Sequence, residues 1–417
     1  MGVTLARQGL LVAALGVTQI IGYGTVYYAF PILAPAVARE FGVGEPFLFG
    51  LFSVGMLLGG ALAPVLGRLL DRLGATRIMT AGSLSMTVLL ALQALSPNLY
   101  VFGGLMILIE VLSFAVLYDA AFAMLAQKCP DNTRSAITRL TLIAGFASTI
   151  FWPLSGYLVD VLGWRGTLLV YAASHVLCVA IHLWTATVPW AAARVLPDRS
   201  VLPATAVSSP SMSAASAMRA FQLLAIGFAL TGMAISAVTV HLVEILGSLD
   251  IGEAVYPAAM VMGPAQVVVR VLDATVWRDR HPMFVAVLSA GAILVAILLL
   301  LLPGPASPVA FGFAATLGAG AGLSSIVRGA VPVALFGTTG LGLRLGRLAA
   351  IRNMLGAAAP FLFAWVVSAY SMTWAILAAL VVSMSGLVAM LVLHRDLRRL
   401  GVVPPLGARA IKNGMSA

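Results

Sequence analysis

Three charged side chains lie within long apolar stretches of the sequence, where a charge can do chemistry. Glu110 and Asp119 fall in the stretch 99–126, and Arg328 falls in the stretch 307–335. A carboxyl group can take up and release a proton, and a guanidinium can bind an anion or pair with a carboxylate. Because a charge in apolar surroundings is costly unless it is paired or neutralised, these three residues are our first candidates for function.

A second set of polar side chains follows the period of a helix. Gln19, Tyr23 and Tyr27 recur every four residues, which places their polar tips on one helical face. That face could line a cavity or make hydrogen bonds to a neighbouring helix. His241 and Glu244 are spaced i, i+3 and could form an interfacial pair or respond to the outside pH.

The composition shows which solvent surrounds the elements that carry these residues. Of 417 residues, 61% are apolar and only 9% are charged, whereas an average soluble domain has about 25% charged residues. So much apolar surface excludes a disordered protein. The net charge of +10 comes without dense basic stretches, which excludes a nucleic-acid binder. So few charges cannot coat a soluble particle of this size, so most of the chain must lie in lipid.

Twelve apolar stretches are long enough to cross a bilayer, which takes about 20 residues in a helix. We predict spans at about 9–36, 46–69, 77–95, 99–126, 136–159, 166–187, 219–246, 253–276, 282–302, 307–335, 345–368 and 372–394. The first stretch lacks the charged and cleavable parts of a signal peptide, so we expect it to be retained. The predicted fold class is an all-α membrane protein with twelve transmembrane helices.

The basic residues predict the orientation of these spans. With the N-terminus in the cytoplasm, 20 of the 24 Lys and Arg residues fall on cytoplasmic segments. Only Arg39 and Arg165 fall on outer loops. Such asymmetry is typical of multi-pass proteins, so we expect both termini in the cytoplasm and residence in the cytoplasmic (inner) membrane. It also explains the positive net charge without a nucleic-acid partner.

A Pro/Ser/Ala-rich segment divides the chain into two halves with six predicted spans each. The predicted organisation is an N-terminal six-helix bundle at 1–187, a cytoplasmic linker at 188–217, a C-terminal six-helix bundle at 218–394 and a cytoplasmic tail at 395–417. A linker of this composition is expected to be flexible.

The two halves can be aligned at a shift close to 208 residues. Gly55 then falls on Gly263, and Asp71-Arg72 falls on Asp279-Arg280. Asp119 comes within one residue of Arg328. Two similar bundles related by an axis along the membrane normal are one known design for transporters.

The turn after the second span holds the most specific motif. It reads Gly67, three residues, Asp71-Arg72, one residue, Gly74 and then Arg77. The glycines allow a tight reversal and a close approach of helices. Asp71 can lie near the positive end of a neighbouring helix. In the second half, Thr275 and Pro282 replace the two glycines, so we expect that copy to be degenerate.

This turn resembles the cytoplasmic signature of the major facilitator superfamily, and Gly163-Trp164-Arg165 resembles another of its signs. The resemblance implies two pseudo-symmetric six-helix bundles that rock around a central site, with the first, fourth, seventh and tenth spans lining the cavity. It implies that the turn is a latch favouring the outward-facing state. The alternative is a simple topology anchor.

By this resemblance, Asp119 and Arg328 would face each other across the cavity. As an ion pair they could bind substrate, couple protons or gate the inner side, or they could simply join the two halves. Glu110 lies nine residues before Asp119 on the same predicted span, so the two should point to nearly opposite faces of that helix and cannot both face the same cavity wall. Glu110 could be a protonatable coupling group or a neutral, hydrogen-bonded packing residue.

The expected function is proton-coupled secondary transport of a small solute across the lipid bilayer by a monomer, with export slightly favoured over uptake. The alternatives are uptake of a small organic anion attracted by Arg328, and a membrane sensor or intramembrane enzyme. The sequence shows no catalytic motif, nucleotide-binding loop or metal-ligand cluster, so we expect no enzyme activity, cofactor or metal. Cys129 and Cys178 are expected to be packing residues, with a soft-metal thiolate site as the alternative.

Overall fold

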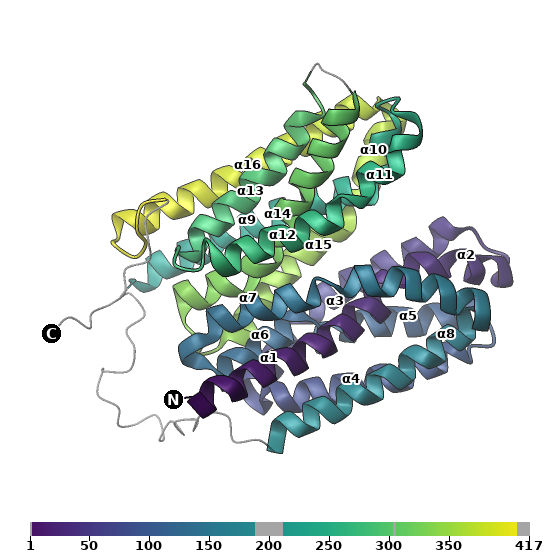
Figure 1. Cartoon of the computed structure of the whole chain (residues 1–417), viewed down its shortest axis with the longest axis horizontal. Coiled ribbons are helices and arrows are strands. Elements are labelled where there is room, and N and C mark those ends of the chain that lie inside the picture. The colour runs from purple at the N-terminus through teal and green to yellow at the C-terminus, as the bar shows by residue number, and fades with distance from the viewer. Residues whose placement is uncertain (1, 188–211, 303–305, 407–417) are drawn as a thin grey trace. The chain divides into compact units, whose positions relative to one another are not determined.

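Every regular element in the computed structural model is a helix across the residues that it describes, which are 2–187, 212–302 and 306–406 (Figure 1). Eleven helical stretches are long and apolar enough to cross a membrane. One of them, Pro130–Thr187, has 58 residues and can cross twice. Gly163 interrupts it with a left-handed backbone (φ 67°) that suits glycine. The all-α fold with twelve predicted spans is therefore confirmed.

The chain divides into two compact units, which we describe separately. The first unit holds residues 1–209 and 337–350, so it includes the start of a helix from late in the sequence. Its helices are α1 (Gly2–Tyr23), the π-helix η1 (Gly24–Tyr28), α2 (Phe30–Phe41), α3 (Glu45–Leu73), α4 (Ala75–Ala94), α5 (Leu99–Ser113), α6 (Tyr118–Lys128), the 3₁₀ turn η2 (Pro130–Asn132), α7 (Thr133–Ala144) and α8 (Ala147–Thr187).

The second unit holds residues 210–336 and 351–417. Its helices are α9 (Ala214–Val240), α10 (Leu242–Gly247), the 3₁₀ turn η3 (Gly252–Ala254), α11 (Val255–Met260), α12 (Met262–Thr275), α13 (Pro282–Leu299), α14 (Ala306–Phe336), α15 (Leu341–Ala369) and α16 (Met372–Arg399). The first ten residues of α15 belong to the first unit. Residues 188–211 of the predicted linker 188–217 lie outside the described residues. So do residues 407–417 of the predicted tail 395–417.

Several predicted spans are interrupted rather than continuous. The span at 9–36 contains the π-helix η1 between α1 and α2. The span at 99–126 breaks at residues 114–117, between α5 and α6. Neither a glycine nor a proline marks this second break, so its position was not visible in the sequence. The prediction that Glu110 and Asp119 share one helix on opposite faces was therefore wrong, because they lie on different helices.

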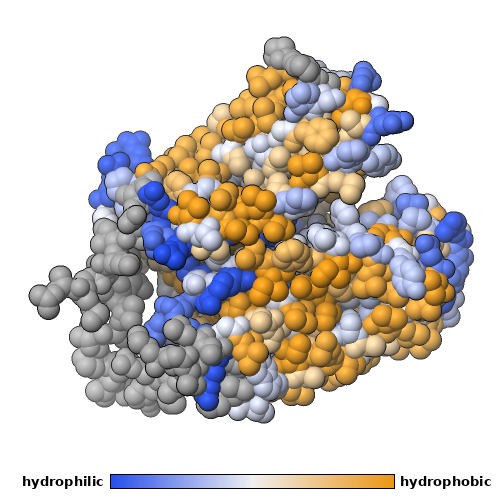
Figure 2. Space-filling view, viewed as in Figure 1, coloured by the Kyte–Doolittle hydropathy of each residue, from blue (hydrophilic) through white to orange (hydrophobic). Residues whose placement is uncertain are grey.

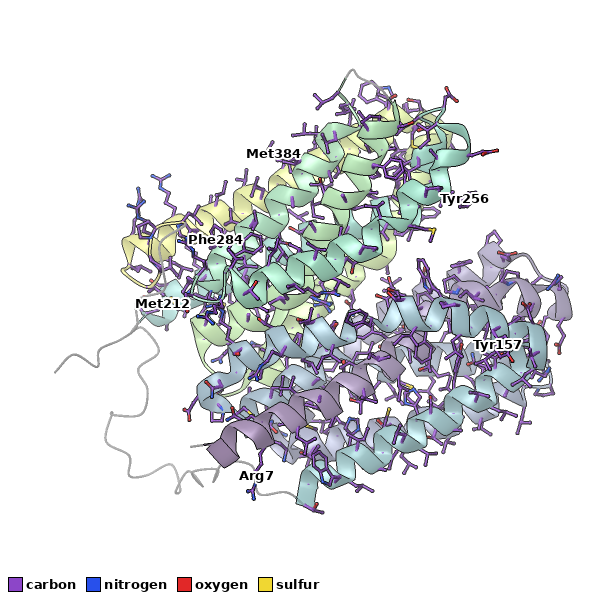
Figure 3. The ribbon with its side chains drawn as sticks, viewed as in Figure 1. Arg7, Tyr157, Met212, Tyr256, Phe284 and Met384 are labelled. Atoms are coloured by element: carbon purple, nitrogen blue, oxygen red, sulfur yellow. The ribbon has the colours of Figure 1, made fainter. Side chains whose placement is uncertain are left out.

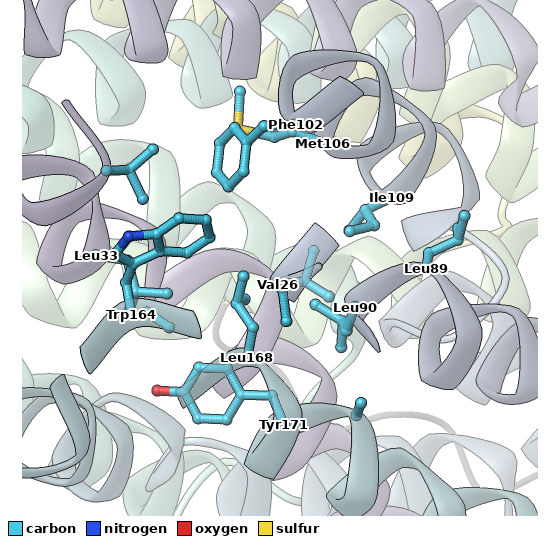
Figure 4. Packing of buried hydrophobic residues seen from close by; sticks show 14 of the residues in the cluster. Val26, Leu33, Leu89, Leu90, Phe102, Met106, Ile109, Trp164, Leu168 and Tyr171 are labelled. Carbon is cyan, nitrogen blue, oxygen red and sulfur yellow. The ribbon is translucent and has the colours of Figure 1, made fainter. Parts of the chain in front are cut away.

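The core of the first unit is a cluster of aliphatic and aromatic side chains (Figure 4). Its members come from helices far apart in sequence, among them Phe102 and Ile109 on α5, Leu168 and Tyr171 on α8, and Val26 on η1. Burying side chains of this size contributes about 1.5–3 kcal/mol each in water. In lipid the same contacts act mainly through close packing.

Large apolar side chains also face outward, as a lipid solvent requires. On α4, Leu84, Val88 and Leu92 recur every four residues and are each about half exposed. Figure 2 shows hydrophobic surface along the flanks of the helices and hydrophilic patches toward their ends. This distribution matches helices whose sides contact lipid and whose ends contact water.

The Gly163-Trp164-Arg165 segment ties one end of the first unit together. The indole nitrogen of Trp164 donates to Glu40 at 2.6 Å. The Arg165 guanidinium donates to the Glu40 carboxylate at 2.6 Å and to the carbonyl of Ala94 at 2.6 Å. The end of α2, the end of α4 and the second half of α8 are joined by these contacts. Sequence reasoning identified the segment but not its partner, Glu40.

Candidate functional site

The predicted turn motif forms a tight reversal between α3 and α4. Gly74 has a positive φ of 87°, a conformation that side chains rarely adopt, so glycine is required there. Gln127 on α6 braces the turn from the side. Its amide nitrogen donates to the carbonyl of Leu70 at 3.1 Å, and its amide oxygen accepts from the backbone N–H of Ala75 at 2.9 Å. Sequence reasoning missed Gln127, because a single glutamine carries no spacing signal.

The carboxylate of Asp71 caps the start of α15. Its Oδ1 accepts from the backbone N–H of Gly342 and its Oδ2 from that of Leu343, both at 2.8 Å. The first N–H groups of a helix have no partner within the helix, and its N-terminus carries a partial positive charge. The predicted contact of Asp71 with the positive end of a neighbouring helix is therefore present, and α15 is that helix.

Small residues allow α3 and α15 to approach within backbone contact. A Cβ atom added to Gly67 would collide with the carbonyl of Gly342, and one added to Gly346 would collide with the carbonyl of Ala63. Ala63 and Gly67 are spaced i, i+4, as are Gly342 and Gly346, so each pair forms one side of the seam. Small residues on α3 therefore face small residues on α15.

The two arginines of the motif point to the surface. Arg72 and Arg77 are both exposed, at the end of α3 and in the first turn of α4. Basic residues at such a place suit an interface between lipid headgroups and water. Their contribution to a latch stays a prediction.

A separate cavity lies inside the first unit, among η1, α2, α3, α4, α5 and α8. Its volume is about 40 Å³, which is room for roughly three waters. Most of its lining is apolar and includes Val26, Leu90 and Ile109 of Figure 4. Its polar lining consists of Thr25, Gln93 and Glu110.

Glu110 is a buried carboxyl group on this cavity wall. Its residue is only 5% exposed, and the ion pairs within the described part of the chain do not include it. Gly55 on α3 makes room for it, because a Cβ at that glycine would lie 2.7 Å from the Glu110 Cβ. The group therefore has a cavity and polar neighbours but no cation to neutralise it.

Thr25 connects the cavity to a buried histidine. The Thr25 hydroxyl donates to the carbonyl of Ile21 at 2.9 Å, so toward the His175 Nε2, also 2.9 Å away, its oxygen acts as an acceptor. The imidazole of His175 then needs only one N–H, on Nε2. That wiring fits a neutral ring within the bundle.

The three polar residues of the first span do not act as one face. Gln19 is fully buried and donates from Nε2 to the carbonyl of Val116 at 2.8 Å. That carbonyl lies in the break between α5 and α6, where it lacks the usual helical partner. Tyr23 packs on Tyr118 with ring centroids 4.6 Å apart, whereas Tyr27 is 44% exposed. The turn of π-helix η1 between these positions changes the helical phase.

Asp119 and Arg328 belong to different units. Asp119 is buried in the first turn of α6, where the helix dipole favours a carboxylate. Arg328 is partly buried on α14. Their pairing stays a prediction.

In the described residues, no group of three or more His, Cys, Asp or Glu side chains could hold a metal ion. Cys129 and Cys178 are free and buried. Burial raises the pKa of the Cys129 thiol, which disfavours the thiolate that a soft metal needs.

The comparison with protein families matches the model of the Major Facilitator Superfamily over residues 15–327. The chain belongs to the major facilitator superfamily. This membership points to a transporter and agrees with the resemblance seen in the turn motif. No curated protein matches the chain.

Solved structures of superfamily members share the fold. The human organic anion transporter MFSD10 (TETRAN) aligns with a TM-score of 0.68 and 16% identity, covering 92% of this chain and 99% of that one. FucP, solved in the outward conformation, aligns with a TM-score of 0.65 and 15% identity, covering 91% of this chain and 98% of that one. The proton:xylose symporter XylE aligns with a TM-score of 0.67 and 12% identity, covering 94% of this chain and 96% of that one. At these identities the likeness concerns the fold alone.

Proposed function

We propose that this superfamily member is a proton-coupled secondary transporter for a small solute, working by alternating access, with Glu110 as the residue that takes up the coupling proton. Export is the direction that we favour. The observation that carries the proposal is the buried carboxyl group of Glu110 on a cavity that has room for water.

The chemistry of Glu110 supports this role. An isolated carboxylate is expensive to bury, so a site without a cation tolerates the neutral acid better. The cavity wall also carries the polar side chains of Gln93 and Thr25, and the cavity has room for water. A carboxyl group that is neutral in one state and charged in another links protonation to conformation.

The Asp71 cap supplies the conformational part of the proposal. It joins the α3–α4 turn to the start of α15 through two hydrogen bonds of 2.8 Å. These hydrogen bonds join segments that lie 271 residues apart in the sequence. We propose that it stabilises one state of the transport cycle, as a latch.

A second candidate function is uptake of a small organic anion. Arg328 lies on α14 without being fully exposed, and a guanidinium in such a place can bind a carboxylate. Similarity in fold to MFSD10, which is described as an organic anion transporter, supports testing anions first. In either case we propose a multi-pass protein of the inner membrane with both termini in the cytoplasm, acting as a monomer.

The test is transport in proteoliposomes that contain a pH-sensitive dye. A labelled panel of small carboxylates, monosaccharides and hydrophobic cations is followed under an imposed proton gradient. We expect one class to move against its concentration gradient together with a proton flux. Accumulation driven by inward-directed protons would reject export by antiport and favour uptake.

The variant Glu110→Gln tests the coupling residue itself. We expect it to retain exchange of labelled for unlabelled solute but to lose concentrative transport, since glutamine cannot release a proton. Glu253→Gln, at an exposed carboxylate, is the matched control and should behave as wild type. Concentrative transport at the wild-type level in Glu110→Gln would overturn the assignment.

A further inference from the structure

His241 occupies a joint in the second unit, away from the cavity and the turn. It interrupts the helix between α9 and α10. Its Nδ1 lies 2.8 Å from Oε2 of Glu244, and its Nε2 lies 3.1 Å from the carbonyl oxygen of Pro360 on α15. The ring also stacks on Phe363 with centroids 4.9 Å apart. The His241 side chain, at the joint between α9 and α10, thus contacts α15 at two residues, Pro360 and Phe363.

The contact falls where Pro360 interrupts the hydrogen-bond ladder of α15, which continues as a helix on both sides, and we call this position the proline break. Pro360 has no N–H, so the carbonyl of Gly356 loses its usual helical donor. The hydroxyl of Ser236 on α9 donates to that carbonyl at 2.7 Å. Five residues later, His241 engages the carbonyl of Pro360 itself. Ser236 on α9 and His241 just after it therefore both bind carbonyl groups of α15 around Pro360.

Counting protons shows what this arrangement requires. A carbonyl oxygen only accepts, so Nε2 of His241 must carry a hydrogen. The 2.8 Å contact between Nδ1 and Oε2 of Glu244 also needs a hydrogen, because two lone pairs would repel each other at that distance. The Glu244 side chain is 52% exposed, so water solvates its charge, and the proton belongs on the ring. The geometry calls for an imidazole with two N–H groups, unlike that of His175.

We infer that His241, Glu244 and the Pro360 carbonyl form a proton-binding site that fastens the end of α9 to the proline break of α15. When the proton leaves Nδ1, the attraction to Glu244 is lost and the ring is free to turn away. Imidazole is the side chain best suited to exchange a proton near neutral pH. The proton reaches the site from water through Glu244. This inference does not depend on the role of Glu110.

No other titratable group on the packed faces competes for this role. The last turns of α9 and the segment 356–369 of α15 carry none, and α10 carries only Glu244. The other titratable side chains at this end are Asp250, Glu253 and Tyr256, which follow α10, and Tyr370, which follows α15 (Tyr256 is labelled in Figure 3). All four are exposed.

The experiment is amide hydrogen exchange of the full chain in lipid nanodiscs at pH 6 and pH 8, corrected for the intrinsic effect of pH. Peptides over 238–247 and 356–366 report the joint and the break. The closed joint needs the imidazole with both N–H groups, a form that low pH favours, so protection should be greater at low pH. We expect roughly tenfold slower exchange at pH 6, the size of one hydrogen bond to a charged group.

Two variants separate the proton site from general packing. His241→Gln keeps hydrogen-bonding atoms but cannot take the proton, so the difference between the two pH values should vanish. Glu244→Gln keeps the imidazole and removes only the carboxylate, and it should also lose the difference, even if His241→Gln folds poorly. His281→Gln, at the cap of α13, should retain it. Equal protection at both pH values in wild type, or a difference that survives in Glu244→Gln, would overturn the inference.

Discussion

The turn between α3 and α4 and the turn between α12 and α13 occupy equivalent places in the two halves of the sequence, but they do different things. In the first, both carboxylate oxygens of Asp71 accept backbone N–H groups at 2.8 Å. In the second, Asp279 is exposed and lies 3.7 Å from its neighbour Arg278. An aspartate at the aligned position is therefore not sufficient for a cap, and the glycines around it decide whether a helix can approach.

The same contrast holds at one aligned pair of glycines, Gly55 on α3 and Gly263 on α12. A Cβ on Gly55 would lie 2.7 Å from Glu110, whereas a Cβ on the aligned Gly263 would meet nothing within 4 Å. In the first half, Gly55 makes a close contact at the cavity and Gly67 makes one at the latch. In the second half, the aligned Gly263 is also a glycine but has no such close contact.

The largest effect is expected at Gly67, where the seam is tightest. Gly67→Leu would drive a side chain into the backbone of Gly342, which cannot move aside as a side chain can. We expect the loss of at least about 3 kcal/mol, the upper end for overpacking, and a clearly lower unfolding midpoint in detergent. Thr275→Leu, at the exposed aligned position, should change stability by less than about 0.5 kcal/mol. Equal effects of the two substitutions would remove the contrast.

A smaller and opposite pair of effects is expected at Gly55 and Gly263. Gly55→Ala should destabilise by about 1–3 kcal/mol, because its methyl group meets Glu110 and the neighbouring backbone. Gly263→Ala should stabilise by up to about 1 kcal/mol, because alanine is the better helix former and the space is open. Thermal unfolding of the purified variants measures both. If the two substitutions change stability in the same direction, the packing account of Glu110 is wrong.

Much of the fold could be predicted because lipid imposes simple rules on sequence. Long apolar stretches revealed the spans, and Gly67, Asp71 and Gly74 revealed the turn. The partner of Asp71 was not predictable, because nothing near the turn indicates a helix start 271 residues later. The break after Ser113 was also hidden, since tertiary contacts such as that of Gln19 with Val116 stabilise it rather than a local glycine or proline.

The candidate site was predicted in its residue types more than in its geometry. Glu110 stood out because a charge in an apolar stretch is rare. Its cavity could not be foreseen, because helices distant in sequence build it. His241 and Glu244 were visible as a pair, but the Pro360 carbonyl that demands a second N–H comes from another helix.

The most direct test of the account is amide hydrogen exchange at Gly342 and Leu343, whose N–H groups the Asp71 carboxylate binds. We expect Asp71→Ala to speed their exchange roughly tenfold, since a lost helix cap costs about 1–2 kcal/mol. Asp279→Ala, the matched change in the other half, should leave that exchange at the wild-type rate. If Asp71→Ala leaves the exchange of Gly342 and Leu343 unchanged, the first-half turn does not hold α15 and the latch proposal fails.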